Sequence, residues 1–139
     1  MQFRHGDFEA AIENYSKAIM LDPEFGEAYN NRCLVLVVVG RDLSLARHDC
    51  QEAVRLLPNR GDIRETLGFV HLKLGEPLAA LVEYNNALQF NNHSAVALFG
   101  RGLAKEQLGD LKGAKIDFND AREILPSVEF AFGNYGFWW

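Results

Sequence analysis

Small and apolar residues recur along the chain at spacings of three and four, which places them on one stripe of a helix. Gly40, Gly75 and Gly109 each follow an apolar run and suit the left-handed residue that ends a helix. Pro77 fits the first turn of the next helix. The pattern predicts helices and no strands, at residues 7–21, 25–39, 43–57, 61–74, 77–90, 94–108, 111–124 and, for a short helix, 127–133.

Four sets of residues keep the same order and the same offsets along the chain. They are Ala11, Ala46, Ala80 and Ala114; then Tyr15, Cys50, Tyr84 and Phe118; then Ala18, Ala53, Ala87 and Ala121; then Pro23, Pro58, Asn92 and Pro126. Members of the last set stand 35, 34 and 34 residues apart. Such a period indicates a stack of repeated helix pairs, in which alanines allow close approach and the aromatic residue fills the space beside them.

This pattern resembles the tetratricopeptide repeat, whose signature is Trp-x2-Leu-Gly-x2-Tyr, then Ala-x3-Phe, then Ala and Pro. The second half matches in all four copies; in the first half Leu67-Gly68 fits, while the other copies have Arg32-Cys33 and Arg101-Gly102. The segment 99–105 is similar to stand-alone bacterial members. The resemblance implies an all-α, right-handed superhelix of antiparallel helix pairs. We expect one domain, 1–139, with a half repeat 6–24, full repeats 25–59, 60–93 and 94–127, and a capping helix with an aromatic tail, 128–139.

The resemblance also implies that the first helix of each repeat lines a concave, peptide-binding face. The candidate residues there are Glu27, Asn30, Leu34, Val38, Asp62, Glu65, Phe69, Lys73, Phe99, Leu103 and Glu106, with Val37, Leu72, Val96 and Gln107 on the same faces. An apolar floor with a mainly acidic rim suits a peptide with aliphatic anchors and basic flanks. The alternative is that the apolar members are simply core. Leu34 and Val38 are the better groove candidates, because Val35, Leu36 and Val39 can supply the core side.

Some relatives grip a chaperone's carboxylate tail with Lys, Asn and Arg side chains. The matching positions here are Asn30, Leu34, Thr66, Val96 and Gly100, so we expect no such clamp. The net charge of -5 argues against a nucleic-acid partner. The longest apolar stretch, 33–39, is too short to span a membrane.

Cys33 and Cys50 are too few for a disulfide framework, so free buried thiols in a reducing compartment are expected. A disulfide stays open as the alternative, since both lie about equally far from the turn near Arg41. The first ten residues contain no apolar run of signal-peptide length. A cytoplasmic location is expected by elimination.

Candidate chemistry is absent from the pattern. The four histidines are scattered, with no metal-ligand spacing, and there is no phosphate loop, nucleophile elbow or dinucleotide fingerprint. We therefore expect no enzyme and no cofactor, but a protein-interaction module that binds a protein or peptide. The alternative is a self-associating part, or a piece of a larger protein whose activity lies elsewhere. A homodimer is suggested by an uncovered first helix with Phe8, Ile12, Tyr15 and Ile19, and by the aromatic tail Tyr135–Trp139.

Overall fold

The computed structural model describes residues 5–133, and this part of the chain forms eight α-helices and no strand. Each helix lies within two residues of its predicted bounds. The helices are α1 (His5–Leu21), α2 (Gly26–Val39), α3 (Leu43–Leu56), α4 (Gly61–Lys73), α5 (Pro77–Phe90), α6 (Ala95–Gln107), α7 (Leu111–Ile124) and α8 (Val128–Gly133). Within the same residues, no helix has both the length and the apolar character that a membrane span requires.

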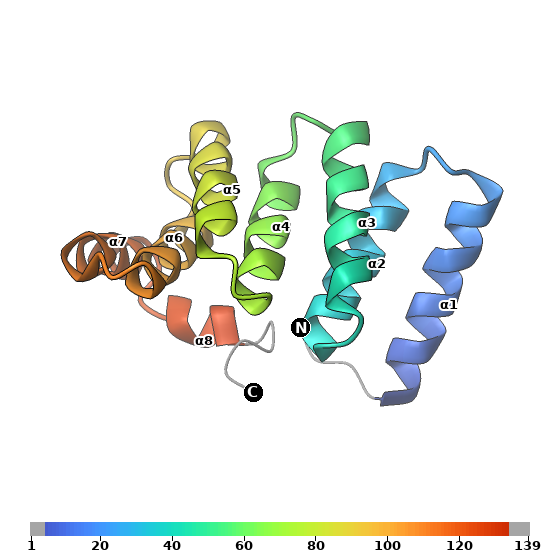
Figure 1. Ribbon diagram of the computed structural model, residues 1–139, viewed down its shortest axis with the longest axis horizontal. Coiled ribbons are helices and arrows are strands. Elements are labelled where there is room, and N and C mark those ends of the chain that lie inside the picture. Colours follow the sequence, from blue (N-terminus) through green and yellow to red (C-terminus); the bar gives the residue numbers. More distant parts are fainter. Residues whose placement is uncertain (1–4, 134–139) are drawn as a thin grey trace.

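The helices form a right-handed stack of antiparallel pairs, as predicted (Figure 1). The pairs are α2 with α3, α4 with α5, and α6 with α7, and they follow one another along an arc. Helices α2, α4 and α6 contact each other in turn, so the first helices of the three repeats make one continuous layer. Helix α1 packs on α2 at one end, and α8 packs on α6 at the other.

Three glycines end the first helices of the repeats. Gly40, Gly75 and Gly109 have φ angles of 70°, 72° and 87°, in the left-handed region that favours glycine. Beyond Gly40, the Arg41 N–H donates to the Leu36 carbonyl at 3.0 Å, which closes the helix end. The predicted glycine caps are confirmed.

Small residues mark the places where paired helices cross. The repeated alanines of α3, α5 and α7 are almost fully buried; they are Ala46, Ala53, Ala80, Ala87, Ala114 and Ala121. In the second repeat the ring of Tyr84 lies against Gly68, where a Cβ atom would come within 2.9 Å of the ring. In the third repeat Phe118 lies against Gly102 in the same way, at 2.6 Å. Each aromatic ring therefore occupies room that a glycine leaves open.

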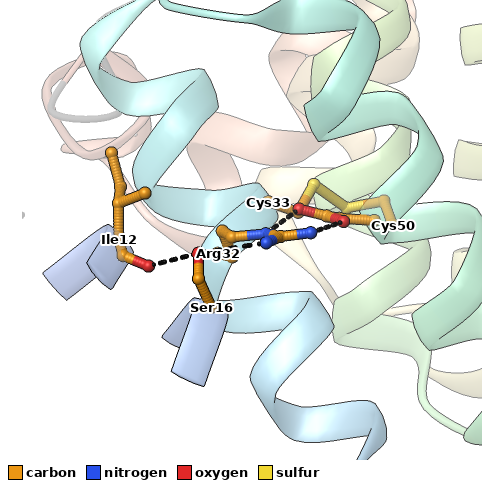
Figure 2. Close-up of polar contacts among 6 residues, drawn as sticks. Ile12, Ser16, Arg32, Cys33 and Cys50 are labelled. Atoms are coloured by element: carbon orange, nitrogen blue, oxygen red, sulfur yellow. Dashed lines mark hydrogen bonds and ion pairs between the residues drawn. A yellow bond between two sulfur atoms is a disulfide. The ribbon is translucent and has the colours of Figure 1, made fainter. Parts of the chain in front are cut away.

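The first repeat uses a disulfide at this position (Figure 2). Cys33 and Cys50 are bonded, with their Cα atoms 5.6 Å apart and neither side chain exposed. The prediction of free thiols is wrong. The reason for the error is physical: Cys33 stands where the later repeats have glycine and Cys50 where they have an aromatic residue, and in those repeats the two positions are in contact. Disulfides are rare in reducing compartments, so the cysteines no longer support the predicted cytoplasmic location.

A buried ion pair joins three helices beside the disulfide (Figure 2). The Arg32 guanidinium donates to both carboxylate oxygens of Asp49, at 2.6 and 2.7 Å, and to the Ser16 hydroxyl of α1 at 3.1 Å. These hydrogen bonds link the α2–α3 pair to α1.

The third repeat contains the same network. Arg101 donates to Asp117 at 2.8 and 2.9 Å and to the Asn85 side chain of α5 at 3.1 Å. Asp49 and Asp117 are both almost fully buried, and the bidentate arginine contact compensates for the burial of each carboxylate. Asp117 also pairs with Lys105 at 3.0 Å. In the second repeat Leu67 replaces the arginine, and Glu83 pairs with Arg64 instead.

Candidate peptide-binding groove

Side chains of α2, α4 and α6 meet in a pocket of about 150 Å³. Five of the predicted groove residues line it: Asn30, Leu34, Asp62, Glu65 and Phe69. Thr66, Tyr84, Val96 and Phe132 complete the wall. The three first helices therefore bring together residues that are up to 66 positions apart in the chain, from Asn30 to Val96.

The α6 side of the predicted groove is covered by α8. The Phe132 ring of α8 lies 5.2 Å from the Phe69 ring and 5.3 Å from the Phe99 ring, measured between centroids. Phe69, Phe99 and Leu103 are each less than a tenth exposed. The predicted capping helix is present, with Val128 and Phe132 buried. The tail Tyr135–Trp139, which was expected to follow it, lies outside the described residues.

The remaining candidates do not line this pocket. Val38 is half-buried on α2, and Glu106 is exposed at the end of α6. The Lys73 ammonium lies 5.9 Å from the centre of the Phe69 ring, and burial lowers its pKa. Of the additional residues named above, Val37 and Leu72 are core. Val96 lines the pocket, and Gln107 is exposed.

Two carboxylates of α4 have opposite electrostatic surroundings. Asp62 is paired with Arg60 at 2.8 Å, and this hydrogen bond lowers the pKa of its carboxyl. Arg60 also pairs with Glu27 of α2, so one cation serves two rim carboxylates. By contrast, burial raises the pKa of the Glu65 carboxyl. A hydrogen bond from Ser94 acts in the opposite direction, but it is the smaller of the two effects.

Ser94 fixes Glu65 in place. Its hydroxyl donates to the Glu65 carboxylate at 2.5 Å and accepts from the Ala97 N–H at 3.1 Å, so it also caps α6. The Glu65 carboxylate is thus held at the start of a helix, where a negative charge is favoured. The carboxylate is positioned from α4 and α6 together.

Three lining residues were not among the predicted site residues: Thr66, Tyr84 and Phe132. Tyr84 comes from α5, a second helix, and was expected only in the core. Its ring reaches the groove because Gly68 and Gly100 on the two neighbouring first helices carry no side chain to cover it. Glycines at these two helix positions are the sequence signal that could have identified it.

Comparison with known proteins places this geometry in a family. A model described as TPR repeat matches residues 2–38. DnaJ homolog subfamily C member 7 of Homo sapiens is 37% identical over 133 residues, which are 90% of this chain and 26% of that protein. Protein O-mannosyl-transferase TMTC3 of Homo sapiens is 32% identical over 105 residues, which are 75% of this chain and 11% of that protein. The chain therefore spans about a quarter or less of these curated relatives.

Solved structures extend the likeness over most of the chain. A structure described as YrrB, a TPR protein with an unusual peptide-binding site, has a TM-score of 0.75 and 30% identity, with 94% of this chain and 67% of that chain covered. A structure of MamA has a TM-score of 0.81 at 22% identity, covering 98% of this chain and 83% of that one, and shows the fold alone. On its repeats, its helix stack and these relatives, the chain belongs to the tetratricopeptide-repeat family.

Proposed function

We propose that this chain binds a segment of another polypeptide in the groove between α2, α4 and α6, and that it catalyses no reaction. The observation that carries the proposal is the pocket itself, because it is open between the three first helices and combines apolar walls with fixed polar groups. The peptide-binding site of YrrB, a protein of the same fold, supports the same use of the fold here. The Thr66 hydroxyl, which also faces the pocket lining, donates a hydrogen bond to the Asp62 carbonyl within its own helix.

Three expectations stay predictions: the cytoplasmic location, the similarity to stand-alone bacterial members of the family, and the absence of a nucleic-acid partner. The curated relatives named above are human proteins that contain much more than this domain.

The groove assignment predicts that Leu34→Ser weakens binding of a peptide by roughly tenfold. Leu34 lines the pocket and is half-buried, so a ligand that covers the rest of it would gain about 1.5 kcal/mol from this side chain. The ligand is a peptide selected from a random displayed library against the full chain, and its affinity is measured by fluorescence anisotropy.

The matched control is Leu78→Ser on α5, which removes an equal apolar side chain that is 67% exposed and lies outside this pocket. Its affinity is expected to stay within twofold of the unsubstituted chain. Equal losses in the two variants, or no loss in either with both proteins folded, would contradict the groove assignment.

Self-association is a second candidate, favoured by the exposed apolar end of α1. Met20 and Leu21 are 82% and 88% exposed, while Ile12, Tyr15 and Ile19 on the same helix are only half-buried. Apolar surface of this kind is typical of a contact between chains. We expect light scattering to show a dimer of the full chain at micromolar concentration. The same measurement is made on a version of the chain that ends at Gly133. A dimer that survives the deletion assigns the contact to α1, and monomers in both samples refute self-association.

A further inference from the structure

One wall of the groove pocket carries a hydrogen-bond acceptor without a donor. Asn30 is 8% exposed, and its side-chain Oδ1 is buried with no hydrogen-bond partner in the described part of the chain. Buried polar atoms are nearly always hydrogen-bonded, since losing water without gaining a partner costs free energy. Because Asn30 lines the pocket, its unused acceptor is where a donor from a bound molecule would be satisfied.

The facing helix contributes a second acceptor, which is negatively charged. Glu65 lines the same pocket and takes its hydrogen bond from the neutral Ser94 hydroxyl. Asp62, one turn earlier on α4, has Arg60 as a cationic partner, whereas Glu65 forms no ion pair with any residue that the structure describes. A half-buried carboxylate without a counter-ion among these residues can be stabilised by a cation from a bound molecule.

The rest of the pocket is apolar. Leu34, Phe69 and Val96 line it beside Phe132 of α8. Its volume of about 150 Å³ is that of a cavity known to hold a ligand of roughly benzene size. A lysine or arginine side chain matches this combination, because an apolar stem carries a cationic head that has several N–H donors and no acceptor.

We propose that the pocket takes the side chain of one lysine or arginine from the bound polypeptide. The Glu65 carboxylate pairs with the cation, and Asn30 Oδ1 accepts a second hydrogen bond from it. The inference rests on the proposed peptide-binding function and names the residue that this site selects. Charge complementarity supports it, because Glu27 and Asp62 at the rim share a single arginine, Arg60, while Lys73 lies further along α4 over the Phe69 ring.

The test starts from peptides selected from a random displayed library on the full chain. We expect the selected peptides to share a lysine or an arginine at one position. In a synthetic peptide, replacing that residue by glutamine is expected to weaken binding to the unsubstituted chain by roughly tenfold to a hundredfold. The same replacement is expected to matter less than twofold for the Glu65→Gln variant, so the two changes form a double-mutant cycle.

Two further variants separate this pairing from a general charge effect. Glu123→Gln removes an equal charge from an exposed position of α7, outside the pocket, and is expected to keep the full lysine or arginine dependence. Asn30→Asp adds a charge at nearly unchanged shape and is expected to raise the affinity of the cationic peptide several-fold. Thermal melts of each variant confirm that it is folded.

The outcomes distinguish this inference from the function beneath it. Peptides that bind through Leu34 without a shared cationic residue, or an apolar residue selected at that position, overturn the pocket assignment and leave peptide binding intact. Equal glutamine penalties in the unsubstituted chain and in Glu65→Gln also overturn it. If no peptide is selected at all, it is the proposed function that fails.

Discussion

Replacing Ala87 by arginine is expected to lower the free energy of unfolding by about 3 kcal/mol or more. Ala87 is 1% exposed on α5 and belongs to the buried alanine set that faces α4. A long cationic side chain there either forces the two helices apart or leaves its charge buried without a partner. Ala53→Arg, at the same place in the first repeat and 0% exposed, should cost a similar amount.

The measurement is the melting temperature by circular dichroism, which should fall by about 10 °C or more. Gln89→Arg and Gln51→Arg are the matched controls, because they add the same residue at exposed positions of the same two helices. Surface substitutions of this kind usually change the free energy of unfolding by at most about 0.5 kcal/mol. A melting temperature unaffected by either alanine substitution would show that the repeat positions are assigned wrongly.

The helix stack could be predicted because its signals are local and repeated. Alanine spacing, a glycine at a helix end and Pro77 at a helix start each act within one or two turns, and the 34-residue period repeats them. Every helix in residues 5–133 was accordingly placed to within two residues. The five pocket-lining candidates were found by the same argument, since position within a repeat determines which face a side chain occupies.

The closure of the α6 side could not be predicted in the same way. Phe132 reaches Phe69 and Phe99 only because the chain turns back after α7, and no periodic pattern sets the direction of that turn. Phe69, Phe99 and Leu103, which the repeat register places on the groove face, are each less than a tenth exposed. Tyr84 is fully buried, and it lines the pocket only because Gly68 and Gly100 carry no side chain there, a feature that a search for functional side chains does not examine.

The disulfide was missed although the repeats contained the information. Cys33 and Cys50 occupy the two positions that the second repeat fills with Gly68 and Tyr84. A comparison of those positions across the three repeats shows a small residue opposite a large one twice, and two cysteines once. Equal distance from a turn shows only that Cys33 and Cys50 can approach each other. The glycine and the aromatic ring at the same positions of the later repeats show that these two positions are in contact.

Reducing the Cys33–Cys50 bond is expected to lower the free energy of unfolding by about 3 kcal/mol. The cysteines are 17 residues apart, and closing a loop of that length in the unfolded chain contributes about this amount in the chain-entropy account. Both sulfur atoms belong to fully buried residues, so the reduced pair is enclosed in the same space. Alkylation under denaturing conditions, read by mass spectrometry, should find no free thiol before reduction and two after it.

Exchange of the repeat positions tests whether the bond stands in for an aromatic contact. Cys33→Ala with Cys50→Ala should be about 3 kcal/mol less stable than the oxidised chain and insensitive to reductant. Cys33→Gly with Cys50→Tyr installs the pair of the second repeat, and Thr66→Gly opens the space that Gly100 leaves for Tyr84. This triple variant should also ignore reductant, yet melt at a higher temperature than the double alanine. If it melts lower, or if the unsubstituted chain shows two free thiols and no response to reductant, the equivalence of the bond and the ring is wrong.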